Sequence, residues 1–344
     1  MLNPYIFLRY YNISSITRYM NLKGRDFITT EDFTLEEIEF LVDKSLELKQ
    51  AFRRGIPHKS ILDKTLFLLF FDKSTRTRNA FEAAMTQLGG HAHYIDVSSS
   101  QIAHGESPKD TGIILSSYGH GIAIRHDLVP GEGNRYQREV AKWAETPVIN
   151  LQCDIDHPTQ TLADLMTLRE CYGTNLKGLK IAVSWAFAPS YLKPFSVPQG
   201  LITLMTRFGM EVVLAHPPEY TLMPETVEQA RNHAENSGGK FRIVYSMEEA
   251  FHDADAVYPK SWGILNLFSA PDKAMAIAQK YRNWICDEKA MSWAKPTAKY
   301  MHCLPADRGN EVTDAVIDGP NSVVYPQAEN RLHTAKALLS NLLG

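Results

Sequence analysis

The stretch Ser74-Thr75-Arg76-Thr77-Arg78 stands between an apolar run at residues 65–71 (TLFLLFF) and an amphipathic segment at residues 79–88 (NAFEAAMTQL). The apolar run is typical of a buried strand, and the amphipathic segment is typical of a helix. Unpartnered backbone N–H groups and the helix dipole attract an anion to a helix start. Arginine adds a planar group that can donate to two phosphate oxygens. The stretch therefore predicts an α/β fold with an anion pocket at a strand-to-helix turn.

The same alternation of strand-like and helix-like segments continues along the chain. Predicted strands are residues 65–71, 91–96, 121–125, 147–151, 180–185, 211–215, 242–245, 256–258 and 300–303, and predicted helices are 34–53, 76–88, 108–118, 134–145, 158–172 and 328–343. Alternation of this kind indicates doubly wound parallel sheets with helices on both faces. The 344 residues are enough for two such domains, and the helix near Pro158 is the expected link between them.

Composition excludes several classes of protein. The net charge of −3 implies no general affinity for nucleic acid or for an anionic membrane, and no apolar run is long enough to span a bilayer. The four cysteines form no CxxC pair, which argues against a zinc ribbon or a disulfide scaffold and fits a cytoplasmic protein. Residues 1–20 lack the apolar core of a signal peptide, so we expect either an extension of uncertain order or a stretch that lies upstream of the true start at Met20.

Chemically active residues recur where predicted parallel strands end, which is where ligands bind in such sheets. They are Ser74 to Thr77, Arg125, His157 to Gln160 (HPTQ), Lys260 with Trp262, and His302 to Pro305 (HCLP). Any one of them alone is more often a capping or solvated residue, and His157-Pro158 alone reads as a helix entry turn. Their recurrence indicates a site.

Three other interpretations fit less well. Cys303 as a nucleophile lacks a base, because His302 beside it points to the opposite face of a strand. Cys153 with His157 would need a second ligand pair to hold a metal, and the sequence has none at metal spacing. A dinucleotide fold would need G-x-G-x-x-G after a strand, and this motif is absent. We therefore expect neither metal nor cofactor.

With these motifs in order, the chain resembles the aspartate/ornithine transcarbamylase family. STRTR (74–78), GIAIR (121–125), HPTQ (157–160), HCLP (302–305) and AENR (328–331) carry the resemblance, which extends from about Lys23 to the end. It implies a carbamoyl phosphate-binding domain at residues 21–165 plus 327–344 and an amine-binding domain at residues 166–326.

The resemblance also implies a role for each matching residue. The phosphate is expected to bind to Ser74, Thr75, Arg76 and Thr77, and Arg125 is expected to bridge the phosphate and the carbonyl. His157 is expected to polarise the carbonyl, and Arg331 is expected to bind near it. The carbamoyl NH₂ is expected to be held by Gln160 and by the backbone carbonyls of Cys303 and Leu304. Gln101 lies in a segment (SQIAHGE) that matches a loop reaching into a neighbouring subunit. The resemblance thus implies a homotrimer with shared sites.

Departures from the ornithine enzymes concern the acceptor. Lys260 stands where they carry an aspartate, and Asp154 stands where they carry an asparagine. A lysine repels a cationic amine and tolerates an anionic or acylated end. The KSW segment at Lys260–Trp262 and the proline-rich stretch 186–198 resemble the knotted transcarbamylases, which act on N-acetylornithine, N-succinylornithine or unknown acceptors. We therefore expect a trefoil knot in the second domain and acceptor contacts from Asp154, Trp185, Lys260 and Trp262.

The prediction is thus a transcarbamylase that moves the carbamoyl group of carbamoyl phosphate to an amino-acid-like amine with an anionic or acylated end. An ordinary, citrulline-forming ornithine carbamoyltransferase is the first alternative. A non-catalytic phosphate-binding homologue is the second, although binding alone has no need of His157 and Gln160.

Overall fold

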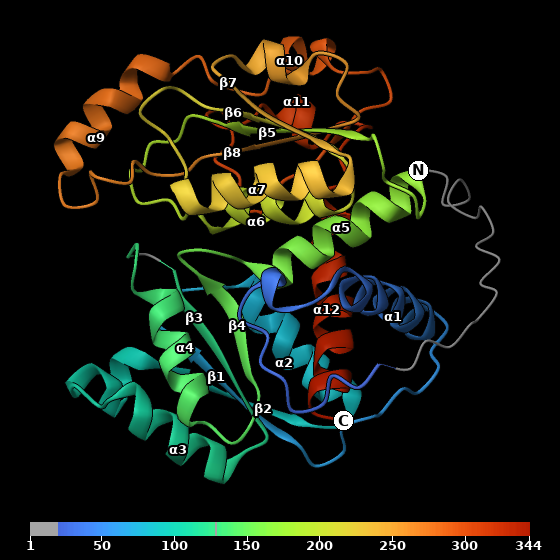
Figure 1. Cartoon of the computed structure of the whole chain (residues 1–344), viewed down its shortest axis with the longest axis vertical. Coiled ribbons are helices and arrows are strands. Elements are labelled where there is room, and N and C mark those ends of the chain that lie inside the picture. The colour runs from blue at the N-terminus through green and yellow to red at the C-terminus, as the bar shows by residue number, and fades with distance from the viewer. Residues whose placement is uncertain (1–19, 128) are drawn as a thin grey trace.

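The chain folds into two α/β lobes, one above the other in Figure 1. The computed structural model describes residues 20–127 and 129–344, so the predicted extension, apart from Met20, lies outside the described residues. Every strand pair in both sheets is parallel. The predicted class, two parallel-sheet α/β domains, is confirmed.

The first lobe is built on a sheet in the order β2-β1-β3-β4. Its strands are β1 (Thr65–Phe70), β2 (His91–Asp96), β3 (Gly121–His126) and β4 (Val148–Cys153). Successive side chains of a strand point to opposite faces, and here both faces are covered. Leu66, Leu68 and Phe70 pack in one apolar cluster, whereas Leu69 packs in another. A strand that is buried on both faces has a continuous apolar sequence, which is why TLFLLFF predicted a buried strand.

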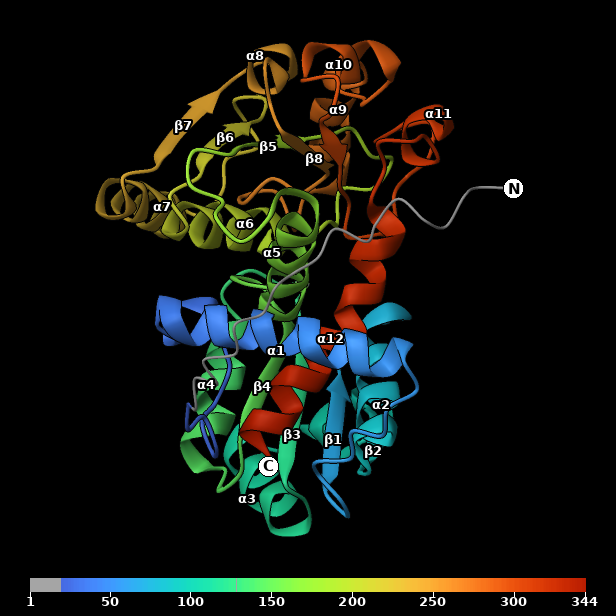
Figure 2. The same cartoon turned by 90° about the vertical axis from the view of Figure 1, so that its right-hand side faces the viewer.

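Helices cover these two faces separately (Figure 1). One face carries α3 (Pro108–Tyr118) and α4 (Gly133–Trp143), and the other carries α1 (Leu35–Arg53), α2 (Arg76–Leu88) and the terminal helix α12 (Val324–Leu342). Thr34 begins α1 with a capping box, in which its hydroxyl accepts from the backbone N–H of Glu37. The last helix of the sequence therefore packs on the first sheet, beside α1 and α2 (Figure 2).

The second lobe holds a sheet in the order β7-β6-β5-β8-β9. Its strands are β5 (Lys180–Trp185), β6 (Glu211–Ala215), β7 (Lys240–Val244), β8 (Ala256–Lys260) and β9 (Lys299–Tyr300). Helices α6 (Ser196–Arg207) and α7 (Pro224–Ser237) lie on the side toward the first lobe (Figure 1). The remaining helices, α8 (Met247–Phe251), α9 (Pro271–Ala278), α10 (Glu288–Trp293) and α11 (Asp314–Ile317), surround the rest of the sheet.

Several predicted boundaries in this lobe differ from the observed ones, and two of the differences have a clear cause. The strand expected at residues 300–303 ends at Tyr300, because the backbone N–H of His302 donates to the side chain of Gln327 and the chain leaves the sheet. The loop expected at residues 186–198 ends at Phe195, because α6 begins at Ser196 and includes Pro198 in its first turn. Proline is tolerated there, since the N–H groups of a first helical turn have no partner within the helix. The predicted knot stays a prediction.

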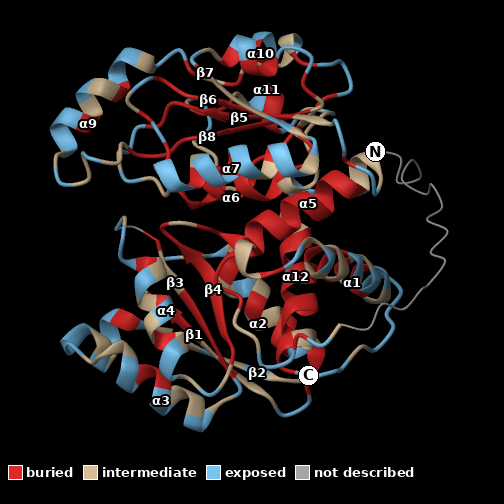
Figure 3. Cartoon of the chain, in the orientation of Figure 1, coloured by how far each residue is buried: buried red, intermediate tan, exposed pale blue. Residues whose placement is uncertain are grey.

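Two helices, α5 (Pro158–Tyr172) and α12, connect the lobes (Figure 2). The buried helix α5 runs from the end of β4 toward the second sheet, and nearly all of it is buried (Figure 3). The predicted domain limits, residues 165 and 326, fall within α5 and α12, and the division stays a prediction. No helix among residues 20–127 and 129–344 is long and apolar enough to cross a membrane.

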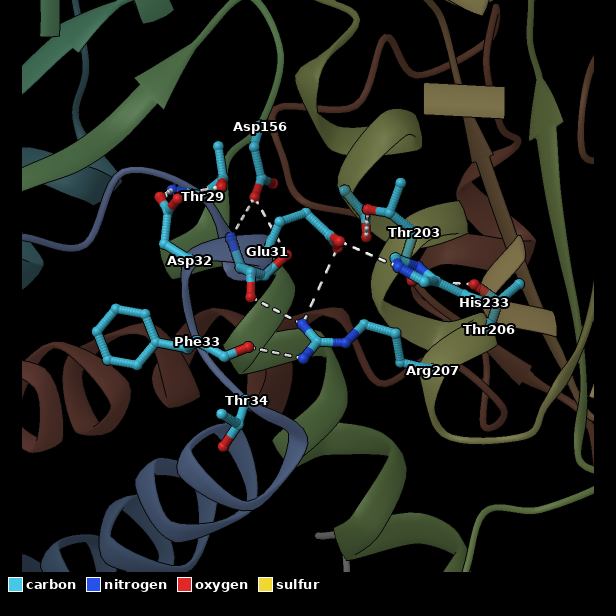
Figure 4. A network of polar contacts seen from close by, with 12 residues as sticks. Thr29, Glu31, Asp32, Phe33, Thr34, Asp156, Thr203, Thr206, Arg207 and His233 are labelled. Atoms are coloured by element: carbon cyan, nitrogen blue, oxygen red, sulfur yellow. Dashed lines mark hydrogen bonds and ion pairs between the residues drawn. The ribbon is translucent and has the colours of Figure 1, made fainter. Parts of the chain in front are cut away.

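A polar seam also joins the lobes (Figure 4). Arg207 at the end of α6 donates to the carbonyl oxygen of Thr30 over 2.8 Å, and the carboxylate of Glu31 lies 3.1 Å from His233 of α7. The backbone N–H of Thr30 in turn donates to the carboxylate of Asp156 over 2.9 Å. Because Asp156 directly precedes His157, the seam supports the turn that begins α5.

Candidate active site

Each of the two sheets has a switch point, where the strand order reverses. These points lie between β1 and β3 in the first sheet and between β5 and β8 in the second. Ligands of open α/β sheets bind beyond the carboxyl ends of strands at such points. A cavity of about 410 Å³ lies there, with Arg76 and Arg125 from the first lobe and Lys260 from the second.

The lining of this cavity brings together most of the residues that the motifs predict. It consists of Lys73, Ser74, Thr75, Arg76, Thr77, Arg125, Gln152, His157, Gln160, Lys193, Pro194, Val197, Lys260, Cys303, Leu304, Pro305 and Arg331. The whole predicted donor-binding set is present. Sequence analysis missed Lys73, Gln152, Lys193, Pro194 and Val197, which lack a recognisable pattern.

The start of α2 forms one wall. Thr75 is the residue before the helix and makes no side-chain capping bond, so the first-turn N–H groups are not capped by a side chain of the helix itself. Burial lowers the pKa of Arg76, and the nearby positive charge of Arg125 lowers it further. Two guanidinium groups crowded beside a helix start favour a multiply charged anion.

Arg331 of α12 is locked into the same wall. Its guanidinium donates to Gln160 Oε1 and, over 2.8 Å, to Thr77 Oγ1. Arg331 is 3 % exposed, and burial lowers its pKa to about 10, with the carboxylate of Asp164 opposing this shift. The group therefore stays charged at neutral pH while it joins α2, α5 and α12.

Asp164 and Gln327 support this arrangement, and sequence analysis missed both. Asp164 Oδ1 accepts from the side-chain amides of Gln160 (2.7 Å) and Gln327 (2.6 Å), and burial raises the pKa of Asp164 to about 6. Gln327 Oε1 accepts from the backbone N–H of His302 over 3.0 Å. The signal was available, because Asp164 lies four residues after Gln160, and Gln327 lies four residues before Arg331, on one helix face each.

His157 occupies the N-cap position of α5 and is 4 % exposed. Burial, together with the charges of Arg331, Arg125 and Arg76, lowers its pKa well below the usual value. The imidazole is therefore neutral at physiological pH. A neutral imidazole keeps one N–H, which it can donate to a carbonyl oxygen without bringing in another cation.

Arg125 is held at the end of β3 by Asp127. The guanidinium donates to Asp127 Oδ2 over 3.0 Å, and its Nε atom is buried without a hydrogen-bond partner among the described residues. Burial raises the pKa of Asp127 to about 6, which the charge of Arg125 partly opposes. The salt bridge fixes the orientation of Arg125 without using all its donors.

Cys303 does not have the features of a nucleophile. Burial raises the pKa of its thiol, which keeps the sulfur protonated. The imidazole Nδ1 of His302 accepts from the backbone N–H of Leu304 over 2.8 Å and is not available as a base for the thiol. This fits the expectation that Cys303 contributes backbone groups.

The second lobe contributes two lysines to the lining of the cavity. Lys260, at the end of β8, donates to the carbonyl of Ser261 over 2.8 Å, and the residue is 8 % exposed. Lys193, from the loop between β5 and α6, pairs with the carboxylate of Asp307 at 2.7 Å. The carbonyl of Lys193 also accepts from the backbone N–H of Gly263, which ties the loop to the segment after β8.

Three predicted acceptor contacts lie away from the cavity. The indole of Trp185 donates to the carbonyl of Trp262, and the indole of Trp262 donates to the carbonyl of Tyr220, so both side chains are 1 % exposed within the second lobe. Asp154 accepts from the backbone N–H groups of Gly131 and Asn134 at the start of α4. These contacts occupy the polar groups expected to bind an acceptor.

Gln101 lies in a short helical turn, Gln101–His104, on the surface and outside the cavity of its own chain. Within residues 20–127 and 129–344, no group of three or more His, Cys, Asp or Glu side chains is arranged to hold a metal ion.

Comparison with known proteins agrees with this geometry. Residues 25–170 match the carbamoyl-P binding domain of aspartate/ornithine carbamoyltransferase, and residues 195–342 match its Asp/Orn binding domain. The protein named "Putative carbamoyltransferase YgeW" from Escherichia coli (strain K12) is 41% identical, with 95% of this chain and 91% of that protein covered. The ornithine carbamoyltransferase of Pyrococcus abyssi is 38% identical, with 94% and 98% covered.

Solved structures extend the comparison. Ornithine carbamoyltransferase from Pyrococcus furiosus superposes with a TM-score of 0.85 at 38% identity, covering 95% of this chain and 99% of that chain. Acetylornithine transcarbamylase complexed with acetylcitrulline has the same TM-score at 31% identity, covering 93% and 99%. These matches confirm the resemblance carried by the motifs, and the chain belongs to the aspartate/ornithine carbamoyltransferase family.

Proposed function

We propose that this carbamoyltransferase takes its carbamoyl group from carbamoyl phosphate and transfers it to the amine of an amino-acid-like acceptor with an anionic or acylated end, releasing phosphate. The observation that carries the proposal is the charge of the cavity. Arginines line it from the first lobe, and Lys193 and Lys260 line it from the second.

The donor side of the cavity, by which we mean residues 74–77, Arg125, His157, Gln160 and Arg331, suits a mixed anhydride. The start of α2 and Arg76 bind the phosphate, Arg125 contacts phosphate and carbonyl, and His157 donates to the carbonyl oxygen. Gln160 and the backbone carbonyls of Cys303 and Leu304 hold the carbamoyl NH₂, and Arg331 lies near the carbonyl.

The reaction needs no step beyond acyl transfer. The lone pair of the acceptor amine attacks the carbamoyl carbon, and negative charge develops on the carbonyl oxygen, where Arg125 and His157 stabilise it. The bond from carbon to the phosphate oxygen then breaks. The proton lost by the amine leaves with the phosphate, whose oxygens lie next to the reacting nitrogen and are basic enough to accept it.

The acceptor side, Lys193 and Lys260, favours an anionic or acylated end because the charge of Lys260 would repel a free ammonium group. Asp307 offsets the charge of Lys193. An ordinary ornithine carbamoyltransferase remains the alternative, supported by the ornithine enzymes among the relatives. A mutant of N-acetyl-L-ornithine transcarbamylase has been solved with carbamyl phosphate and N-succinyl-L-norvaline, which supports the first proposal.

We further propose a homotrimer in which the loop of Gln101 completes the cavity of a neighbouring subunit. The exposed position of that loop, away from its own cavity, supports this arrangement.

A panel of amines tests the acceptor. Carbamoyl phosphate is mixed with ornithine, N-acetylornithine, N-succinylornithine or aspartate, and phosphate release is corrected for the rate without amine. We expect turnover with an acylated or dianionic acceptor and little with ornithine. Turnover of ornithine alone would show that the role given to Lys260 is wrong. Carbamoyl phosphate binding without any turnover would favour a binding protein, and the variant Arg76→Ala should abolish that binding.

A further inference from the structure

A buried carboxylate, Glu311, lies behind the acceptor side without lining the cavity. It is 1 % exposed. Its Oε1 accepts from the backbone N–H of Ser261 over 2.7 Å, and its Oε2 accepts from the backbone N–H of Asp307 over 2.7 Å. Oε2 also lies 3.4 Å from His302 Nε2. One side chain thus meets three separate parts of the second lobe.

Glu311 carries a charge despite its burial. Burial alone raises the pKa of a carboxylate, but His302 and Lys260 nearby and the backbone N–H of Asp307 lower the pKa of Glu311 well below its usual value. A charged acceptor makes stronger hydrogen bonds than a neutral one. The hydrogen bonds that the carboxylate of Glu311 accepts are therefore strong.

The imidazole of His302 extends these contacts to the HCLP segment. Its Nδ1 accepts from the backbone N–H of Leu304, so in the neutral ring the proton is on Nε2, the nitrogen that faces Glu311. The imidazole of His302 thus lies between the carboxylate of Glu311 and the backbone N–H of Leu304. These contacts fix the segment whose carbonyls, at Cys303 and Leu304, are assigned to the carbamoyl NH₂.

The other two contacts of Glu311 concern the acceptor side. Ser261 directly follows Lys260, so the bond to its N–H anchors the backbone that presents that lysine. Asp307, bonded through its N–H, is also the ion-pair partner of Lys193. Moving Glu311 would therefore shift both acceptor-side lysines relative to the HCLP carbonyls.

We propose that Glu311 is a positioning residue that holds the acceptor side in register with the Cys303–Leu304 carbonyls, and so aligns the acceptor amine with the carbamoyl carbon. The proposal rests on the proposed function. Its basis is that a displacement of about 1 Å in a reacting pair can cost on the order of 100-fold in rate. Glu311 itself touches neither substrate.

The variant Glu311→Gln tests this, because it keeps the side-chain volume and replaces one acceptor oxygen by an NH₂ group that faces an N–H donor. We expect kcat with the best acceptor to fall about 10- to 100-fold and the acceptor KM to rise. The inhibition constant of inorganic phosphate should stay at the wild-type value, because phosphate binds the donor side. A general loss of folding would weaken all of these together.

Asp255→Asn is the matched control. Asp255 is also a second-lobe carboxylate that accepts from a backbone N–H (Lys180, 2.9 Å) and from a lysine (Lys295, 2.6 Å), but it precedes β8 at the end away from the cavity. Its kinetics should equal those of the wild type. Wild-type kcat and acceptor KM in Glu311→Gln would overturn the proposal, and so would an equal loss of phosphate affinity.

Amide hydrogen exchange without substrate separates this proposal from the proposed function. In Glu311→Gln, the N–H groups of Ser261, Leu304 and Asp307 should exchange faster than in the wild type and in Asp255→Asn. Unchanged exchange at these amides would overturn the positioning role whatever the acceptor is. An acceptor panel in which the wild type turns over no amine would instead count against the proposed function.

Discussion

The donor side and the acceptor side of the cavity differ in how their charged groups are held. On the donor side, Arg331 is 3 % exposed and donates to residues of two other helices, Thr77 and Gln160. On the acceptor side, the Lys193 side chain is 18 % exposed and pairs with the carboxylate of Asp307. A planar guanidinium with several bonds has one orientation, whereas an ammonium on a flexible stem has many.

This difference explains which half of the function could be inferred from motifs. A group fixed by several neighbours needs those neighbours, so its sequence surroundings are characteristic. A lysine on a loop, such as Lys193, needs few, so its sequence surroundings are less characteristic. The donor-side residues that line the cavity were accordingly predicted from motifs, and Lys193 was not.

Removing the most constrained donor-side group should have the largest effect. Arg331→Met keeps the length of the side chain but loses the donors near the carbonyl, and we expect kcat to fall about 100- to 1,000-fold, as for loss of an oxyanion donor. Steady-state phosphate release measures this. A fall of less than tenfold would mean that the rigid network serves the fold alone, and thermal unfolding of the variant would report that role.

Removing an acceptor-side lysine should have a smaller and more selective effect. Lys260→Met should raise the acceptor KM about 10-fold or more, as expected for a lost charge contact, and leave carbamoyl phosphate affinity unchanged. The two constants are separated by varying each substrate at saturating levels of the other. Equal effects on both substrates would remove the distinction between the two sides.

The pH dependence gives a third comparison. Because the pKa of His157 is lowered by burial and by the surrounding arginines, the ring should stay neutral in the folded protein as pH falls through about 6.5. The unfolded chain does take up that proton, so His157 contributes a loss of stability as pH falls below about 6.5. The free energy of unfolding of the variant His157→Gln should therefore fall less than that of the wild type as pH drops below about 6.5. NMR titration of the wild type that shows protonation near the ordinary histidine pKa would contradict the neutral donor.

Breaking the seam should affect activity least. Arg207→Met removes two bonds from a guanidinium to carbonyl oxygens, those of Thr30 and Phe33, and should lower unfolding stability by about 2 kcal/mol. The donor-side contacts stay intact, so we expect kcat to change little. Chemical denaturation and kinetics of the same preparation test both statements. A large fall in kcat at unchanged stability would show that the seam controls His157 through Asp156.

Much of the fold followed from local patterns. The apolar run that became β1 and the helix that begins at Thr34 each depend on neighbours in sequence, and both were found where predicted. The short strand β9 was not, because the side chain of Gln327, distant in sequence, takes the backbone N–H of His302. Acceptor contacts were expected from Trp185 and Trp262 because of the resemblance and their positions at strand ends, and their indoles bond within the second lobe.

The sequence by itself determined the parallel α/β class, the family and most of the residues that line the cavity, because short motifs at strand ends record local backbone geometry and the chemistry that it allows. Tertiary structure alone decided how the two switch points meet, which lysines enter the cavity and how Asp164, Gln327 and Glu311 support it. These are contacts between residues far apart in the chain, and their formation depends on the packing of both lobes rather than on any local pattern. The STRTR segment at residues 74–78 thus pointed to a carbamoyl phosphate-binding domain, and the assembled cavity is the basis for the proposed acceptor.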